Sequence, residues 1–230
     1  MLVTSISKEN IKKYVIKQLN TFFPDGNDVR ECKELDAAFE NAFVRIEKCF
    51  SHIAVRGYSV KTEEGKKSAY FQHTNSDQYC QFLYFLSNSL WNEFPEKKDI
   101  CDKLILLNKA LHGCWFTYKV KLPDIFILSH PVGSVIGHAL YSDYLVIHQN
   151  VTIGEREIGA TKRIGKYCFL STGSSIIGDG EIGDNVSIGV NAVIYKEDIE
   201  SNSIVYLDKN TGERHIKKNK GLSRAHDLFC

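Results

Sequence analysis

Aliphatic residues recur at every sixth position in the second half of the chain. The positions are Ile164, Leu170, Ile176, Ile182, Ile188 and Ile194. A period of six fits neither an α-helix, which repeats every ~3.6 residues, nor a strand, which alternates between two faces. It fits a coil with three flat faces, because each face directs one aliphatic side chain inward and turns at the next polar or glycine position. We therefore predict a parallel β-helix, a prism of stacked coils.

The six-residue frame is less regular on both sides of this core. Before it, the frame is visible only from Ile147 to Ile153, and the next anchor, Ile164, follows eleven residues later. The extra residues, in the stretch GEREIGATKR, are predicted to leave the prism as a short loop. After Ile194 the frame breaks, and residues 199–206 are predicted to form a last strand. The polar and basic tail, residues 209–230, is expected to be mobile.

The first ~115 residues follow the helical period instead. Helices are predicted over residues 7–23, about 28–50, from Asn75 or Ser76 to about 90, and between Pro95 and His112. Asn75 or Ser76 can cap the third helix, and Gly113 is expected to end the fourth. The predicted fold class is α+β: an all-helical domain over residues 1–115, a β-helix domain over 116–208, and the tail. The aromatic stripe from Phe82 to Leu86 is interpreted as core and subunit contact.

The composition argues against a nucleic-acid-binding, a membrane-inserted or a metal-binding protein. The chain has 230 residues, 43% of them hydrophobic and 25% charged, and a net charge of +1 that gives no reason to expect nucleic acid as a partner. No stretch approaches the length of a membrane span, and the first residues lack a signal-peptide core, so a cytoplasmic protein without membrane insertion is expected. The seven dispersed cysteines contain no C-x-x-C, which predicts reduced thiols and no metal site.

Candidate chemistry gathers where the coils begin. Three of the eight histidines, His130, His138 and His148, fall within nineteen residues. Taken singly, each is more often a solvated edge residue than a catalyst. A cluster in a prism is more informative, because the packed axis of a β-helix rarely tolerates histidine, and its members then face an edge or a groove.

The stretch LSHPVGSVIG (128–137), followed by VIHQNVTIG (146–154), resembles the serine acetyltransferase family of the hexapeptide-repeat acyltransferases. That family carries L-D-H-x-x-G-x-V-x-G, and then I-x-Q-x-V-T-x-G about a coil later. The resemblance spans roughly residues 124–206. It implies that the β-helix is left-handed and that the protein is an acetyl-CoA-dependent O-acetyltransferase.

By this resemblance, His130 is the general base that takes the proton of the acceptor hydroxyl. An imidazole suits that task, because a hydroxyl is a poor nucleophile at neutral pH. A carboxylate that holds the other ring nitrogen would orient the base; Asp124 is the first candidate and Asp143 the alternative. The candidates for contact with the acceptor are Asp143, His148, Gln149 and Asn150.

The family also implies that coenzyme A binds in a groove between neighbouring prisms, so a homotrimer or a dimer of trimers is expected. Backbone N–H groups at Gly154 and Gly173 are candidates for the pantetheine amides and the thioester oxygen. A cationic patch for the phosphates is predicted from Lys209, Lys217 and Lys218, with Lys220 nearby. The alternative is that these lysines belong to a solvated basic tail.

Two departures from the family bear on the acceptor. Ser129 stands where the family has an acid, and the loop after V-T-x-G lacks the family's arginine–histidine pair. Only Arg156, Lys162 and Arg163 provide positive charge there. We therefore expect a sugar of a surface polysaccharide as acceptor, on a platform of Tyr141, Tyr144, Gln149 and Asn150, with L-serine as the alternative.

A third hypothesis comes from a different class: a hexapeptide-repeat trimer that is non-catalytic or zinc-dependent. Its zinc ligands would be His130, His138 and His148 across a subunit interface. The Q-x-V-T-x-G match and the proline beside His130 argue against it.

Overall fold

The computed structural model describes residues 1–62, 65–154 and 162–230, and the chain divides into two compact units. Unit 1 comprises residues 1–51, 56–113 and 117–119. Unit 2 comprises residues 52–55, 114–116 and 120–230. Within the described part of the chain, no helix has the length and apolar character needed to span a bilayer.

Unit 1 is built on helices at the predicted places. They are α1 (Lys8–Phe22), α2 (Lys33–Ser51), α3 (Ser76–Glu93) and α4 (Lys98–His112), the last preceded by the short η1 (Pro95–Lys97). Asn75 caps α3, its Oδ1 accepting the Gln78 N–H at 3.2 Å, and Gly113 ends α4 with a φ of 63°. The second helix begins five residues later than predicted, because residues 28–32 carry no helical hydrogen bonding.

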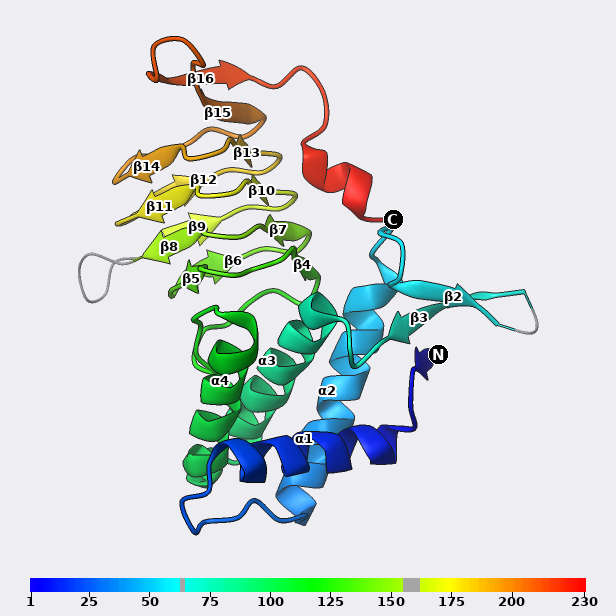
Figure 1. Ribbon diagram of the computed structural model, residues 1–230. Helices are drawn as coiled ribbons and strands as arrows, with labels where there is room; N and C mark the ends of the chain where they lie inside the picture. The colour runs from blue at the N-terminus through cyan, green and yellow to red at the C-terminus, as the bar shows by residue number, and fades with distance from the viewer. Residues whose placement is uncertain (63–64, 155–161) are drawn as a thin grey trace. The chain divides into compact units, whose positions relative to one another are not determined.

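The core of unit 1 surrounds α3, which packs against both α2 and α4 (Figure 1). Phe82 is fully buried, with its ring centroid 5.2 Å from that of Phe43 and 4.9 Å from that of Phe71. The aromatic stripe is therefore core, as predicted, and its part in subunit contact stays a prediction. A small sheet in the order β1-β3-β2, which helical periodicity does not predict, completes the unit: β1 (Leu2–Thr4), β2 (Ser59–Lys61) and β3 (Lys67–Phe71).

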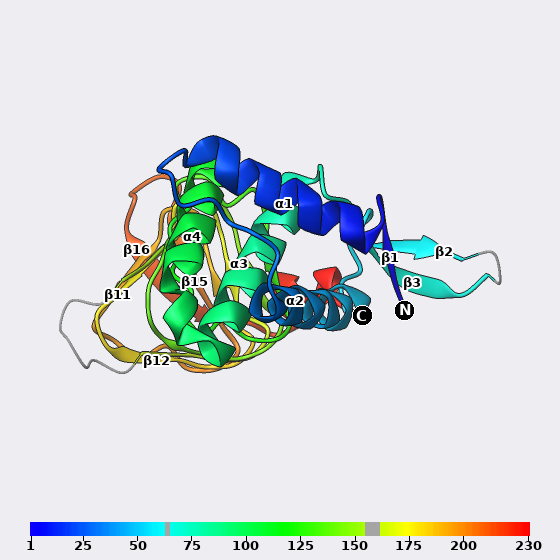
Figure 2. The same cartoon turned by 90° about the horizontal axis from the view of Figure 1, so that it is seen from below.

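Unit 2 is a parallel β-helix with three faces, as the period of six predicts (Figures 1 and 2). Face 1 contains β4 (Phe126–Leu128), β7 (Leu145–Ile147), β10 (Phe169–Leu170), β13 (Ser187–Ile188), β15 (Ser203–Leu207) and β16 (Arg214–Lys218). Face 2 contains β5 (Val135–Ile136), β8 (Thr152–Gly154), β11 (Ser175–Ile177) and β14 (Val193–Tyr195). Face 3 contains β6 (Leu140–Tyr141), β9 (Lys162–Ile164) and β12 (Gly180–Ile182).

The hexad anchors stack along the inside of the prism. On face 1, Leu170 pairs in register with Ile147 and Ile188, and all three are fully buried. The residue two positions before each anchor also points inward: Cys168, Ser174, Val186 and Ala192 have no exposed surface. Each coil therefore places two side chains per face in the core. This regular burial explains why the six-residue repeat can be recognised in the sequence.

The faces meet at three corners. Corner 1, between faces 1 and 2, contains residues 129–134, 148–151, 171–174 and 189–192. Corner 2 lies between faces 2 and 3. Corner 3, between faces 3 and 1, contains residues 142–144, 165–168, 183–186 and 200–202.

The C-terminal tail is ordered, which corrects the expectation of a mobile segment. β16 pairs antiparallel with β15, and the 3-10 helix η2 (Arg224–Leu228) follows. The Cys230 N–H donates to the His52 carbonyl at 2.8 Å, and Phe229 forms a β-bridge with Ile53. Every residue of β16 is exposed, so no hydrophobic alternation marks it in the sequence.

Candidate functional site

His130 occupies a bulge at corner 1. The chain takes seven steps from Leu128 to Val135 but five from Ile147 to Thr152, which are their partners in the next coil. The two extra residues leave His130 exposed at a φ of 49°, in the left-handed region that is rare for a residue other than glycine. The His130 carbonyl accepts the Val132 N–H at 2.7 Å, which closes the bulge. An imidazole at the edge of the prism, rather than in its packed core, is accessible to a substrate.

The two candidate carboxylates lie at another corner. Strand β4 separates Asp124 from His130, and at ~3.3 Å per residue its three residues alone cover roughly 10 Å. The Asp143 Oδ1 accepts the Ile125 N–H at 3.0 Å, which holds this carboxylate at corner 3. Within one chain, the structure therefore does not bring Asp124 or Asp143 beside His130, contrary to the expected pairing.

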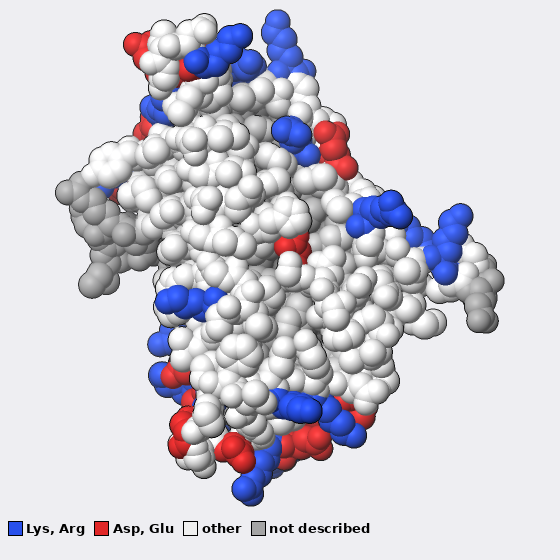
Figure 3. Space-filling view, viewed as in Figure 1, with Lys and Arg blue, Asp and Glu red and all other residues white. Residues whose placement is uncertain are grey.

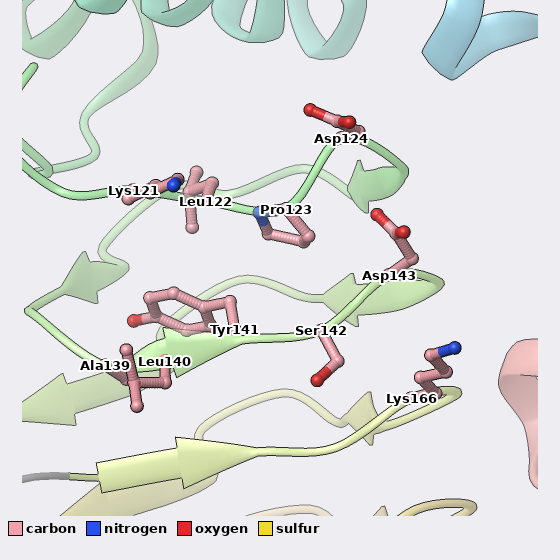
Figure 4. Close-up of a pocket in the computed structure, with 10 residues that line it drawn as sticks. All are labelled: Lys121, Leu122, Pro123, Asp124, Ala139, Leu140, Tyr141, Ser142, Asp143 and Lys166. Carbon is pink, nitrogen blue, oxygen red and sulfur yellow. The ribbon is translucent and has the colours of Figure 1, made fainter.

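Asp124 and Asp143 instead line a surface pocket of about 420 Å³ on face 3 (Figure 4). Lys166 reaches the same end of the pocket from the next coil. Tyr141 lines its floor, and the Tyr141 hydroxyl donates to the Gly137 carbonyl at 2.6 Å. His130 is not among the lining residues, so this pocket and corner 1 are separate features of one chain.

His148, Gln149 and Asn150 lie at corner 1, one coil beyond His130. The ring of His148 packs 4.9 Å from that of Phe169, and its carbonyl accepts the Ser134 hydroxyl at 2.8 Å. The Gln149 Oε1 is buried and has no hydrogen-bond partner among the described residues. The structure thus brings three predicted acceptor contacts to the same corner as the predicted base.

Glycine and asparagine alternate along corner 1 at one left-handed position. Gly133, Asn150, Gly173 and Asn191 have φ values of 76°, 56°, 71° and 56°. A Cβ on Gly133 would lie 2.1 Å from the Asn150 Oδ1, and a Cβ on Gly173 would lie 2.1 Å from the Asn191 Oδ1. Each asparagine amide therefore fills the space that the glycine of the preceding coil leaves open, and the turn alone accounts for Asn150.

The two glycines predicted to contact the cofactor, Gly154 and Gly173, differ in how much of their backbone is available. The Gly173 N–H donates to the Gln149 carbonyl at 3.1 Å, so it is engaged between coils and is not available to a pantetheine amide. This corrects the prediction for Gly173. Gly154 ends β8 at the opposite edge of face 2, and the nearest atom to an added Cβ there would be the Ile177 Cδ1, at 3.3 Å. Gly154 is half-exposed and has no side chain, so among the described residues its backbone allows a ligand to approach closely.

The tail lysines do not form one cationic patch. Lys218 forms an ion pair with Glu200, and the Lys217 Nζ lies 4.9 Å from the ring centroid of Tyr206. Both stand opposite the first residues of β15, whereas Lys209 follows its last residue. Figure 3 shows acidic and basic side chains together at the end of unit 2 that carries these strands. The predicted phosphate patch is therefore dispersed in one chain.

The three positive charges predicted for the loop, Arg156, Lys162 and Arg163, do not lie together at the surface. Arg156 lies outside the described residues, Arg163 is exposed, and Lys162 is buried inside the prism with 2% of its surface exposed. The Lys162 Nζ donates to the Gly154 carbonyl at 2.5 Å and to the Ile176 carbonyl at 3.1 Å. The sequence suggested Lys162 as a positive charge in the loop, but at this buried position it cannot hold an acceptor at the surface.

Other histidines have structural surroundings. His112 is buried in unit 1, where burial lowers its pKa to about 4, and its Nδ1 lies 2.6 Å from the Asn108 Oδ1. His138 lies between β5 and β6 at corner 2, away from His130 and His148. Among the residues that the structure describes, no group of three or more histidine, cysteine, aspartate or glutamate side chains is arranged to hold a metal ion.

No family model matches the chain. Curated relatives do: a serine acetyltransferase of Synechococcus elongatus is 30% identical over 95 residues, which are 40% of this chain and 39% of the relative. A serine acetyltransferase of Staphylococcus aureus is 24% identical over 154 residues, 65% of this chain and 68% of the relative. The chain resembles serine acetyltransferases. It spans about two fifths of the length of the first curated relatives that it matches.

Solved serine acetyltransferases share the fold. The enzyme of Neisseria gonorrhoeae superposes with a TM-score of 0.66 at 19% identity, over 96% of this chain and 83% of that one. A serine acetyltransferase in complex with CoA superposes with a TM-score of 0.59 at 15% identity, over 91% of this chain and 97% of that one. The predicted fold class, helices followed by a left-handed parallel β-helix, is thereby confirmed.

Proposed function

We propose that this protein is an acetyl-CoA-dependent O-acetyltransferase. The observation that carries the proposal is the exposed bulge at corner 1, which presents His130 in a β-helix similar in sequence and fold to serine acetyltransferases. The H-x-x-G-x-V-x-G and Q-x-V-T-x-G stretches form this bulge and the coil stacked on it.

The proposed chemistry needs one proton carrier. The His130 imidazole takes the proton of the acceptor hydroxyl as its oxygen attacks the thioester carbonyl carbon of acetyl-CoA. The tetrahedral intermediate collapses, the carbon–sulfur bond breaks, and the imidazolium returns the proton to the leaving thiolate. Acetyl-CoA is a co-substrate, and no metal ion takes part in this scheme.

We propose L-serine as the acceptor, in place of the sugar that the sequence favoured. The proteins similar to this chain in sequence and in fold are named serine acetyltransferases. The argument for a sugar was that Ser129 stands where the family has an acid and that the loop lacks the family's arginine–histidine pair. Of the charges that could replace this pair, Lys162 lies inside the prism, Arg156 lies outside the described residues, and Arg163 is exposed. The proposal of L-serine therefore rests on the similarity to serine acetyltransferases, with Arg163 as the described candidate for the serine carboxylate.

We also propose that the protein works as a homotrimer or a dimer of trimers. Face 2 exposes Val135, Val193 and Tyr195, which are 41%, 48% and 48% exposed, and corner 1 exposes Val132 and Val190. An apolar strip of this kind suits contact with a second prism. In such an assembly, Asp124 or Asp143 would have to act on His130 from a neighbouring copy, because neither lies beside it in one chain.

A thiol-release assay tests the function. Acetyl-CoA is offered together with L-serine or with a panel of sugars, and free coenzyme A is measured over time. Release that depends on an added hydroxyl acceptor is the expected result. Stoichiometric zinc in the purified protein, with no thiol release for any acceptor, would favour the zinc-dependent trimer instead.

A further inference from the structure

Lys162 is a charged side chain in the core of the β-helix. It stands two positions before the anchor Ile164, in the inward slot that the other coils fill with small or neutral residues, and 2% of its surface is exposed. Those residues are Cys168, Ser174, Gly180, Val186 and Ala192. Transfer of an ammonium group from water into a protein interior is strongly unfavourable unless polar partners surround it, so a lysine in this slot calls for an explanation.

The partners of Lys162 join two faces of the prism from the inside. Lys162 begins β9 on face 3, and its Nζ donates to the Gly154 carbonyl at 2.5 Å and to the Ile176 carbonyl at 3.1 Å. These carbonyls belong to β8 and β11, neighbouring strands of face 2. A hydrogen bond from a charged donor is stronger than a neutral one, so the ammonium fixes both carbonyls firmly.

Gly154 is held on its inner side and is half-exposed. Its carbonyl accepts a second hydrogen bond, from the Gly178 N–H at 3.1 Å. It has no Cβ, and an added one would meet only side-chain atoms: the Ile177 Cδ1 at 3.3 Å and the Thr152 Cγ2 at 3.9 Å. A half-exposed backbone segment that is fixed from within, and that has no side chain of its own, is suited to close contact with an extended, amide-containing ligand.

We propose that Lys162 is a positioning residue for acetyl-CoA. Its ammonium holds the backbone of Gly154 from inside the prism, while the cofactor lies against the outer side of the same residue. Lys162 itself touches neither the acceptor nor the cofactor. The inference rests on the proposed transferase function and adds to it a residue that acts through the backbone.

Two substitutions remove the charge in different ways. Lys162→Met keeps the aliphatic stem and loses the ammonium, and Lys162→Ser places in the slot the residue that Ser174 provides on face 2. Lys17→Met is the control, because Lys17 is an exposed lysine of α1 in unit 1 and has no part in the proposed site. We expect the KM for acetyl-CoA, and the Kd for coenzyme A measured by calorimetry, to rise roughly tenfold or more in both variants. The KM for the acceptor and kcat should change less than about threefold, and Lys17→Met should match the wild type.

Gly154→Ala tests the outer side of the same contact without touching Lys162. The added methyl group meets the Ile177 Cδ1 at 3.3 Å, a close contact with the end of a flexible side chain that can move aside, so the fold should be kept, while a cofactor at that surface is displaced. We expect the same rise in the KM and Kd. Wild-type values in Gly154→Ala, or in folded Lys162→Met, would overturn the proposal, and so would loss of folding in both Lys162 variants together with unchanged binding in Gly154→Ala.

The proposed function fails separately. If the wild type binds coenzyme A but releases no thiol with any acceptor, the transferase proposal is wrong, whereas the calorimetric comparison of the variants still decides the role of Lys162. If the wild type does not bind coenzyme A at all, both proposals are wrong.

Discussion

Corners 1 and 3 of the β-helix share a backbone geometry and differ in what they do with it. Each passes through a left-handed residue once per coil. At corner 1 these residues alternate between glycine and asparagine, and at corner 3 they are Tyr144, Tyr167, Asn185 and Asn202, with φ values of 67°, 56°, 58° and 59°. A tyrosine rarely adopts this conformation, so its side chain must gain enough from packing to offset the strain.

Corner 3 is closed by side chains. The rings of Tyr144 and Tyr167 stack with centroids 4.3 Å apart, and the ring of His226, from the tail, stacks on Tyr167 at 3.8 Å. The Asn185 amide donates to the Asn202 Oδ1 at 2.7 Å and to the Gly221 carbonyl at 3.0 Å. The tail is thus bound along this corner, and the residues there are engaged with one another.

Corner 1 has small residues at the equivalent positions and an insertion that carries His130 outward. Its asparagines fill the gaps beside glycines rather than stacking into a column. The comparison teaches that one repeat can give a rigid edge and an accessible edge, according to whether the left-handed position carries a large or a small side chain. The proposed site lies at the accessible one.

The largest expected effect is at His130. His130→Ala should lower kcat in the thiol-release assay by roughly 10²–10⁴-fold, because the acceptor proton then has no base. Coenzyme A binding by calorimetry should persist, since the base does not hold the cofactor. His148→Ala is the matched comparison at the same corner. Near-normal turnover in His130→Ala, together with loss of turnover in His148→Ala, would show that His130 is not the base.

A smaller effect is expected at the glycine–asparagine alternation of corner 1. Gly173→Ala places a Cβ 2.1 Å from the Asn191 Oδ1 at a φ of 71°, and should lower the free energy of unfolding by about 2 kcal/mol. Asn191→Gly in the same chain removes the clash but not the strained φ, so about half of the loss should return. Denaturant unfolding measures both, and no recovery in the double variant would refute the pairing.

The smallest effect is expected at corner 3. Tyr167→Asn keeps a residue that tolerates the left-handed turn and removes both ring stacks, at a cost of about 1 kcal/mol. Hydrogen exchange of the tail amides near His226 should become faster. Unchanged exchange of these amides in a folded Tyr167→Asn protein would show that the ring stacks do not hold the tail.

The sequence predicted the β-helix because one aliphatic anchor per face is a repetitive and unambiguous signal. It did not predict the docking of the tail, because β16 is exposed along its whole length and η2 is polar. Contacts such as the Ser223 hydroxyl with the Tyr167 carbonyl at 2.6 Å join residues far apart in the chain and leave no local pattern.

The candidate site also has features that the sequence could predict and features that it could not. Corner 1 could be predicted, because its motifs are contiguous and turn residues mark it. The distance of Asp124 from His130 could not, because six positions in sequence do not reveal that a strand lies between them. Lys162 was interpreted as a loop charge although its place two residues before Ile164 marks an inward slot; a lysine there contradicts the usual composition of a core.

The most direct test of the account is the steady-state kinetics of the wild-type protein with acetyl-CoA and L-serine, with sugars measured in parallel. The account predicts a kcat/KM for L-serine of about 10⁴ M⁻¹s⁻¹ or more, within the ordinary range of enzymes. Comparable turnover with a sugar and none with L-serine would contradict the proposed acceptor, and no thiol release with any hydroxyl compound would contradict the transferase function itself.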